Sequence, residues 1–283
     1  MGTVRTLKPG DRGYRPPPAP RPVEQPQPQP DTIEDTGPRK ADFEKAIESL
    51  RPAIIAAMGG DNQRATRHIM IFWSHLLSNN SLKLTTPQSY AGAVLSAAQL
   101  GLEVGPLNEC SIQTRQREVE GNWETVAVFS IDYPGWLDII YRNTDVLTVK
   151  ADAVRKQDNI EHESGDREFL RHSFDPSVDR GDIVSWYAYA RLKGAFIYEM
   201  ISRKEVERIR DQYSRKKDRY TGELKEIKGA WKDELEGMGE KTVLKRLTKW
   251  LRKRGKGDLQ LANELDDNVR IGEVVDEITG EIL

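Results

Sequence analysis

The sequence has little of what covalent or metal-based stabilisation would need. Its 283 residues include one cysteine, Cys110, and four histidines. A single cysteine excludes an internal disulfide, and no Cys/His spacing is typical of a zinc site. No run approaches the roughly 18 apolar residues of a membrane span, and the N-terminus carries arginine and proline where a signal peptide is apolar. We therefore expect a cytoplasmic protein without redox chemistry or structural metal.

Catalytic motifs are also missing. No Ser/His/Asp or Cys/His arrangement is evident, and no pair of carboxylates has a context typical of a nuclease. The stretch GMGEKT at residues 237–242 resembles a Walker A loop, but a P-loop needs glycine at the positions of Glu240 and Leu235. A polar stretch weakly indicates a metal cluster, formed by Glu161, His162, Glu163 and His172. We predict that the protein is not an enzyme and requires no cofactor.

Charge is divided unevenly along the chain, although the net charge is only -2. Residues 202–256 contain 19 Lys and Arg against 10 Asp and Glu, whereas residues 257–283 contain one Arg against eight acids. Opposite charge on adjoining segments indicates a polyanion-binding region beside an acidic tail. The tail at 257–283 is either solvated, in contact with a partner, or a shield over the basic region.

The N-terminal segment, residues 1–40, is rich in proline. Ten of the fifteen prolines lie within residues 1–38. Such a segment has few backbone donors and little apolar surface, so we expect a disordered, partly polyproline II tail that is either a spacer or a docking peptide. A folded domain is expected over residues 41–256.

Hydrophobic periodicity predicts the order of secondary structure in that domain. Three helices are expected first, over residues 43–58, 61–78 and 86–101. From about residue 109 the period becomes two, which predicts strands at 110–116, 125–133, 146–154, 183–192 and 195–200. A short helix is expected at 134–142, and Ser202 and Glu205 form a capping box that begins another. The predicted class is α+β, an antiparallel sheet with helices before and after it in the sequence.

A basic helix is expected over residues 231–253. Lys241, Lys245 and Lys249 recur at steps of four residues, with Arg246 alongside. A helical turn rises about 5.4 Å, close to the phosphate spacing of a strand, so such a row is suited to following a nucleic-acid backbone. A solvated basic face is the alternative.

Aromatic residues beside cations are a second feature typical of single-strand binding, because bases stack on flat side chains. Trp123 lies at the tip of the predicted hairpin, near Arg115 and Arg117, and Tyr133 lies where the next helix begins. Trp186, Tyr187 and Tyr189 share one strand and are expected to lie mainly in the core.

Four segments together resemble the RecT family of phage and prophage annealing proteins. They read TPQSY…AAQLGLE from Thr86, FSIDYPGWLD from Phe129, YAYARL…FIYEM from Tyr187 and EGMGEKTVLKRL from Glu236. They occur in the family's order between about residues 43 and 252. Gly239 and Glu240 depart from the family's pattern, which has more helix-favouring or basic residues there.

The resemblance implies a curved antiparallel sheet packed with helices, assembled into rings or helical filaments around a basic groove. It implies that Lys241, Lys245 and Arg246 face DNA and that Arg142 lies in a matching region. Arg115, Arg117 and Lys150 are added from their predicted positions on the hairpin and strand. The implied partners are an exonuclease and a host single-strand binding protein in a bacterial cell.

The function implied is single-strand DNA binding and ATP-independent annealing of complementary strands. Each stacked base-pair step releases on the order of 1.4 kcal/mol, so pairing needs no energy source. Mg²⁺ is expected at most as a DNA counterion. A passive single-strand coating protein, without annealing activity, is the main alternative; a recombinase, a nuclease and a structural assembly protein are the others.

Overall fold

The fold is described from a computed structural model. The structure describes residues 38–119, 122–142, 145–214, 227, 229–251, 258–271, 275–276 and 281–282. These residues belong to one compact unit, Gly37–Leu283. The predicted proline-rich tail, up to residue 37, lies outside the described residues.

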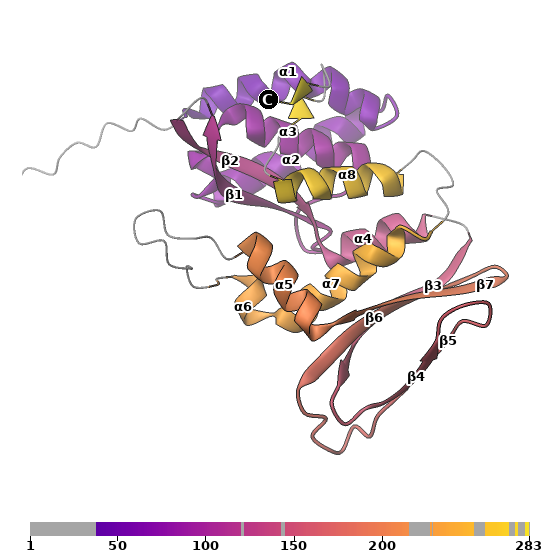
Figure 1. The fold of residues 1–283 in the computed structure, drawn as a ribbon. Helices are drawn as coiled ribbons and strands as arrows, with labels where there is room; N and C mark the ends of the chain where they lie inside the picture. Colours follow the sequence, from indigo (N-terminus) through magenta and orange to yellow (C-terminus); the bar gives the residue numbers. More distant parts are fainter. Residues whose placement is uncertain are drawn as a thin grey trace, which may run out of the picture. The chain divides into compact units, whose positions relative to one another are not determined.

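A layer of helices forms the first part of this unit and confirms the predicted helices. It contains α1 Lys40–Ala57, α2 Asn62–Ser78, the short 3-10 helix η1 Leu82–Leu84 and α3 Pro87–Leu100 (Figure 1). The Asp61 carboxylate caps α2 by accepting from the backbone N–H of Gln63 and Arg64. Gly101 ends α3 in the left-handed conformation, with φ of 62°. The local signals therefore account for the start of α2 and the end of α3.

The predicted hairpin follows as β1 Cys110–Val119 and β2 Asn122–Ile131, and Cys110 pairs with Ile131 at its base. Helix α4, Tyr133–Tyr141, begins at once, so the second strand ends two residues earlier than expected, and it also begins three residues earlier. Gly135 permits this sharp change of direction, because a Cβ there would lie 2.1 Å from the Glu109 carbonyl oxygen.

A three-stranded antiparallel sheet forms the second part, in the order β3-β6-β7. Its strands are β3 Val146–Arg155, β6 Ile183–Leu192 and β7 Ala195–Ser202, all close to prediction. Between β3 and β6 the chain forms a hairpin that the sequence analysis did not predict, β4 Asn159–Glu163 and β5 Phe169–Ser173. Its residues are mostly polar and exposed, so they carry no alternating apolar signal.

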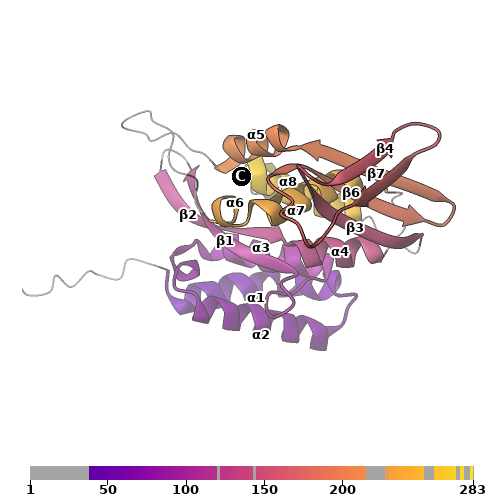
Figure 2. The same ribbon diagram turned by 90° about the horizontal axis from the view of Figure 1, so that it is seen from below.

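Helix α7, Leu235–Thr248, packs on one side of this sheet, and the β4–β5 hairpin lies on the other (Figures 1 and 2). Gly239 allows the close approach of α7, because a Cβ there would lie 2.3 Å from the Trp186 ring. Close packing against Trp186 therefore explains why glycine occupies position 239. The Walker-like stretch is part of α7 and not a loop.

The basic helix expected over 231–253 is interrupted. Helix α5, Arg203–Ser214, begins at the predicted capping box. The short α6, Ala230–Asp233, then precedes α7, with Glu234 between them. Arg252 and Lys253 lie outside the described residues.

Helix α8, Asp258–Ile271, lies in the acidic segment from residue 257, for which a solvated tail, a partner contact and a shield over the basic region were the alternatives. Leu259, Ala262 and Leu265 are buried, and α8 packs against β2, α3 and α4. The acidic segment contains an amphipathic helix whose apolar side completes the core, so the folded region extends past the predicted boundary at 256. The last described elements are β8 Val275–Asp276 and β9 Glu281–Ile282.

Candidate nucleic-acid interface

The cations of α7 do not form one exposed row. The prediction that Lys245 lies on an outward face is wrong: its side chain is 5% exposed and it pairs with Asp266 of α8, itself 7% exposed. Lys245 therefore lies on the buried side of α7 with the apolar residues, because α8 supplies an acid that sequence spacing alone did not reveal.

The neighbouring cations of α7 are also paired. Lys241 Nζ lies 3.4 Å from Asp132 Oδ1 and is mostly buried, and Arg246 pairs with Glu205 of α5. Lys249 follows the last residue of α7 and is exposed. Of the predicted basic row, Lys249 is therefore the most accessible described member.

The Arg142 side chain makes contacts within the fold. It donates to the Leu100 carbonyl oxygen at 2.5 Å, at the end of α3, and pairs with Asp138 and Asp258. These contacts join α3, α4 and α8.

The β1–β2 hairpin places its predicted residues near its tip. Trp123 is 53% exposed, whereas Arg115 and Arg117 are half-buried. Burial lowers the pKa of Arg115, and the negative charge of Asp266 acts against that shift. Arg115 pairs with Val126 and Arg117 with Glu124, whereas Trp123 pairs with Glu118, so strand alternation puts Trp123 on the opposite side of the hairpin from the two arginines.

A different surface gathers aromatic residues and cations. Strand alternation sends Trp186 and Ala188 of β6 toward α7 and sends Tyr187, Tyr189 and Arg191 to the opposite side. We call that side of the β3-β6-β7 sheet the aromatic face, formed by Lys150, Tyr187, Tyr189, Arg191, Phe196 and Tyr198.

The rings of the aromatic face follow one another across β6 and β7. Centroid distances are 6.4 Å from Tyr187 to Tyr189, 5.7 Å from Tyr189 to Phe196 and 6.3 Å from Phe196 to Tyr198. Lys150 pairs in register with Tyr189, and Arg191 with Phe196. The half-buried rings of Tyr189 and Phe196 therefore each have a cation on the adjacent strand.

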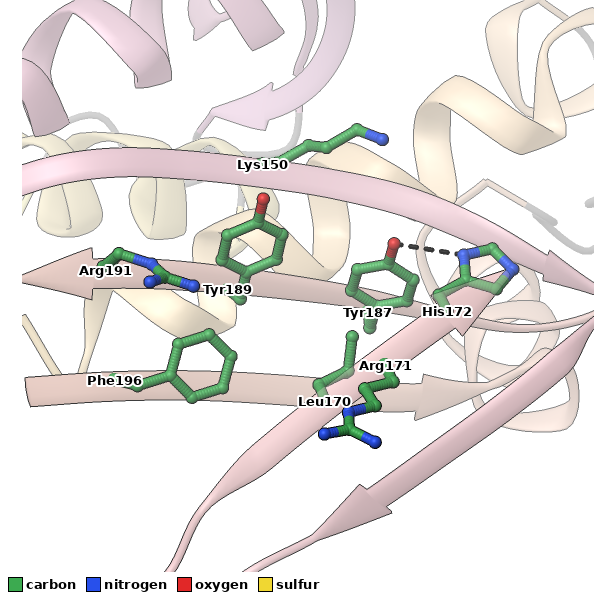
Figure 3. Close-up of a pocket in the computed structure, with 8 residues that line it drawn as sticks. All are labelled: Lys150, Leu170, Arg171, His172, Tyr187, Tyr189, Arg191 and Phe196. Atoms are coloured by element: carbon green, nitrogen blue, oxygen red, sulfur yellow. Dashed lines mark hydrogen bonds between the residues drawn. The ribbon is translucent and has the colours of Figure 1, made fainter. Parts of the chain in front are cut away.

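The β4–β5 hairpin turns this face into a groove. Leu170, Arg171 and His172 of β5 line a cavity of about 380 Å³ together with the aromatic face (Figure 3). The hydroxyl of Tyr198 is 2.6 Å from Ser164 Oγ and 3.2 Å from His162 Nδ1, so the hairpin also contacts β7. We call this cavity the groove.

A buried ion cluster holds the base of the hairpin. Asp158 accepts two bonds from Arg180, at 2.8 and 2.7 Å, and lies 3.0 Å from His172 Nε2. The other ring nitrogen of His172 is 3.1 Å from the Tyr187 hydroxyl. Hydrogen bonding from Arg180 holds the pKa of Asp158 well below its usual range, and burial raises that of Tyr187. The cluster therefore fixes β5 against the sheet.

Three further groups, on β3, α7 and α4, have shifted pKa values. Lys150 donates to Asp152 at 2.6 Å, which raises the lysine pKa. Burial, with the nearby Asp152 and Glu236, raises the pKa of Glu240 to about 7. Tyr133, predicted to contact DNA, is half-buried, and burial raises its pKa.

The aromatic face was only partly anticipated. Tyr187 is buried, 3% exposed, as expected, but Tyr189 is accessible at the groove. Arg171, Arg191, Phe196 and Tyr198 were not predicted as site residues. The alternation of Tyr187, Tyr189 and Arg191 along β6 could have predicted that these side chains share one side of the sheet. The wall of the groove could not be predicted in this way, because the β4–β5 hairpin has no alternating apolar pattern.

The suggested metal cluster does not form. His162 and His172 contact tyrosine hydroxyls, and no group of three or more metal-ligating side chains occurs among the described residues. Within that part of the chain, no helix is long and apolar enough to cross a membrane.

Comparison with known proteins identifies the family of the chain. The chain is 27% identical over 205 residues to Protein RecT of Escherichia coli strain K12, which covers 72% of each chain. A model of the RecT family matches residues 67–276, from α2 past the end of α8. Because the match spans well over half of the sequence, this chain belongs to the RecT family.

Proposed function

We propose that the protein binds single-stranded DNA and promotes the annealing of complementary strands without ATP. Membership of the RecT family is the observation that carries this proposal. The groove and its cations support it, because aromatic rings beside Arg and Lys suit a flexible polyanion whose bases are accessible.

Annealing requires the protein to overcome two obstacles rather than to perform a chemical step. Two polyanions repel each other, and their bases must find register. Cations reduce the repulsion, and a strand held with its bases accessible shortens the search. Since each base-pair step releases on the order of 1.4 kcal/mol, no nucleotide hydrolysis is needed. The protein would thus act without catalytic residues or a required cofactor, with Mg²⁺ as a counterion.

The structure narrows the set of residues that we propose to contact DNA. Lys249, Trp123 and Lys150 stay as predictions at exposed positions, whereas Lys245 and Arg142 are more simply explained by their internal ion pairs. Arg115, Arg117, Tyr133, Lys241 and Arg246 are partly buried, so their contacts with phosphates are proposed only if these side chains become more exposed when DNA binds.

The proposal includes assembly and partners. We propose a homo-oligomer, a ring or filament that aligns grooves of adjacent subunits along one strand. An exonuclease that generates single strands and a host single-strand binding protein are its proposed partners, within the cytoplasm of a bacterial host. The annealed duplex intermediate is the expected product on the protein.

An annealing assay tests the function directly. Labelled complementary oligonucleotides are mixed with the protein without ATP, with and without Mg²⁺, and pairing is followed by energy transfer. We expect pairing to be much faster than in buffer. Tight binding without faster pairing would favour the passive coating protein, and strand cutting that depends on Mg²⁺ would favour a nuclease.

A further inference from the structure

We propose that the groove is a base-stacking site, in which Tyr189 and Phe196 hold unpaired bases of single-stranded DNA while Lys150, Arg171 and Arg191 neutralise the adjoining phosphates. This inference rests on the proposed function and assigns part of it to one surface. It concerns the aromatic face and β5, and not the basic helix α7.

The aromatic rings are arranged for stacking rather than for filling a core. Tyr189 and Phe196 lie 5.7 Å apart with their planes at 31°, and both line the groove. The core side of the same strands is filled by Trp186, Ala188 and Ala190, which are fully buried. A pair of partly exposed rings on the opposite side is therefore not needed to close the core. Aromatic rings stack with any base, so the site would bind without sequence preference.

The charges around these rings favour a polyanion. Arg191 and Arg171 are exposed, and the Lys150 side chain is 55% exposed. Lys150 pairs with Asp152, and Arg171 lies opposite Glu161 in the β4–β5 register, so the charge is partly balanced. An exposed Lys–Asp pair contributes little, so a phosphate can compete with Asp152 for the Lys150 ammonium group. Figure 3 shows Arg191 beside Tyr189 and Phe196, with Lys150 on the adjoining strand and Arg171 extending from β5 in the direction opposite to Leu170.

The β4–β5 hairpin restricts what can enter. It contacts the aromatic face at Tyr187 through His172 and at Tyr198 through Ser164 and His162, so the accessible rings lie between two anchored points. A base inside a duplex has both of its flat surfaces covered by its neighbours, whereas an unpaired base can leave the stack. The groove should therefore bind single strands in preference to duplex.

The test compares normal and abasic strands. Wild-type protein and the Y189L/F196L variant are titrated with oligothymidylate and with an abasic strand of equal length, by fluorescence anisotropy. Stacking is worth about 1–3 kcal/mol per base, so we expect the variant to bind oligothymidylate about tenfold or more weakly. Its affinity for the abasic strand should not change. The ring-preserving variant Y189F/F196Y is the matched control and should bind both strands like wild type.

Two results would overturn the inference: an equal loss of affinity for both strands, or no preference of the wild-type protein for oligothymidylate over the abasic strand. The preference test uses only the wild-type chain, so it holds even if the variant is unstable. Photo-crosslinking of wild-type protein to an iododeoxyuridine strand is a second measurement, with Tyr189 or Phe196 as expected products; crosslinks found only elsewhere would contradict the site. Failure of wild-type protein to bind any single strand would instead contradict the proposed function.

Discussion

Helix α7 and the aromatic face contain the same kinds of cation, but the fold uses them differently. Lys245 of α7 is buried and paired with Asp266, whereas Lys150 of the aromatic face keeps most of its side chain in solvent while it pairs with Asp152. The two Lys–Asp pairs are chemically alike. Because of their surroundings, the Lys245–Asp266 pair is part of the core, whereas Lys150 is accessible to a ligand.

The difference shows why basic residues in a sequence do not by themselves identify a nucleic-acid surface. Residues four apart share a side of a helix, but that side is solvated only if no later element covers it. In this fold α8 and α5 provide acids against α7. Strand alternation on β6 is easier to interpret, because α7 already occupies one side of the sheet.

The largest expected effect concerns the two Lys–Asp pairs. Asp266→Ala removes the partner of a buried ammonium group and should lower the free energy of unfolding by about 3–5 kcal/mol. Asp152→Ala, the matched change in the exposed pair, should cost about 0–1 kcal/mol. Urea denaturation of the two variants measures both. Similar losses would show that Lys245 and Lys150 are in equivalent surroundings, contrary to the structure.

The next effect concerns the packing of α7 on the sheet. Gly239→Ala places a methyl group against Trp186, and overpacking of this kind costs roughly 1–3 kcal/mol. Gly237→Ala, two residues earlier, meets no atom within 4 Å and should stabilise α7 by up to about 1 kcal/mol through helix propensity. Thermal unfolding compares the two. A stabilising Gly239→Ala would contradict the close contact.

A smaller effect should separate the two regions in DNA binding. Lys150→Ala and Arg191→Ala should each reduce the log-log slope of affinity against salt by about 0.7, the value for one lost phosphate contact on a single strand. Lys245→Met should leave the slope unchanged in protein that is still folded. The reverse pattern, with a lower slope only for Lys245→Met, would return the DNA site to α7.

The smallest expected effect concerns Glu240 of α7. The raised pKa of Glu240, about 7, compares with about 4.3 for an unperturbed glutamate, so ionisation of this side chain opposes folding. The wild-type protein should lose stability relative to Glu240→Gln as the pH rises from about 4.3 to 7, with no further change above that range. Urea denaturation at pH values on both sides of this range tests the sign. Partial exposure of Glu240 should keep the difference small.

Much of the fold was predictable from local patterns. The three N-terminal helices, the β1–β2 hairpin and the strands of the β3-β6-β7 sheet follow their hydrophobic periods, and caps such as Asp61 and Gly101 mark ends. Helix α8 was missed because its acidic residues dominated the composition, although Leu259, Ala262 and Leu265 recur at helical spacing.

The candidate site was less predictable. Trp123 and Lys150 lie on exposed positions of the expected elements, but the groove depends on the polar β4–β5 hairpin and on the Asp158 cluster that fixes it. The spacing of Asp158, His172 and Arg180 in the sequence matches neither a helical nor a strand period, so it does not predict that they meet. Their association arises from the return of the chain between β3 and β6.

By itself, the sequence determined the order and type of most elements and the family resemblance, because these depend on residues close together in the chain. Only the tertiary structure decided which charges meet solvent. A lysine on a helix is accessible or buried according to which distant acid and which apolar surface pack against it, and that choice is made when α8 docks on the core and α7 covers one side of the sheet.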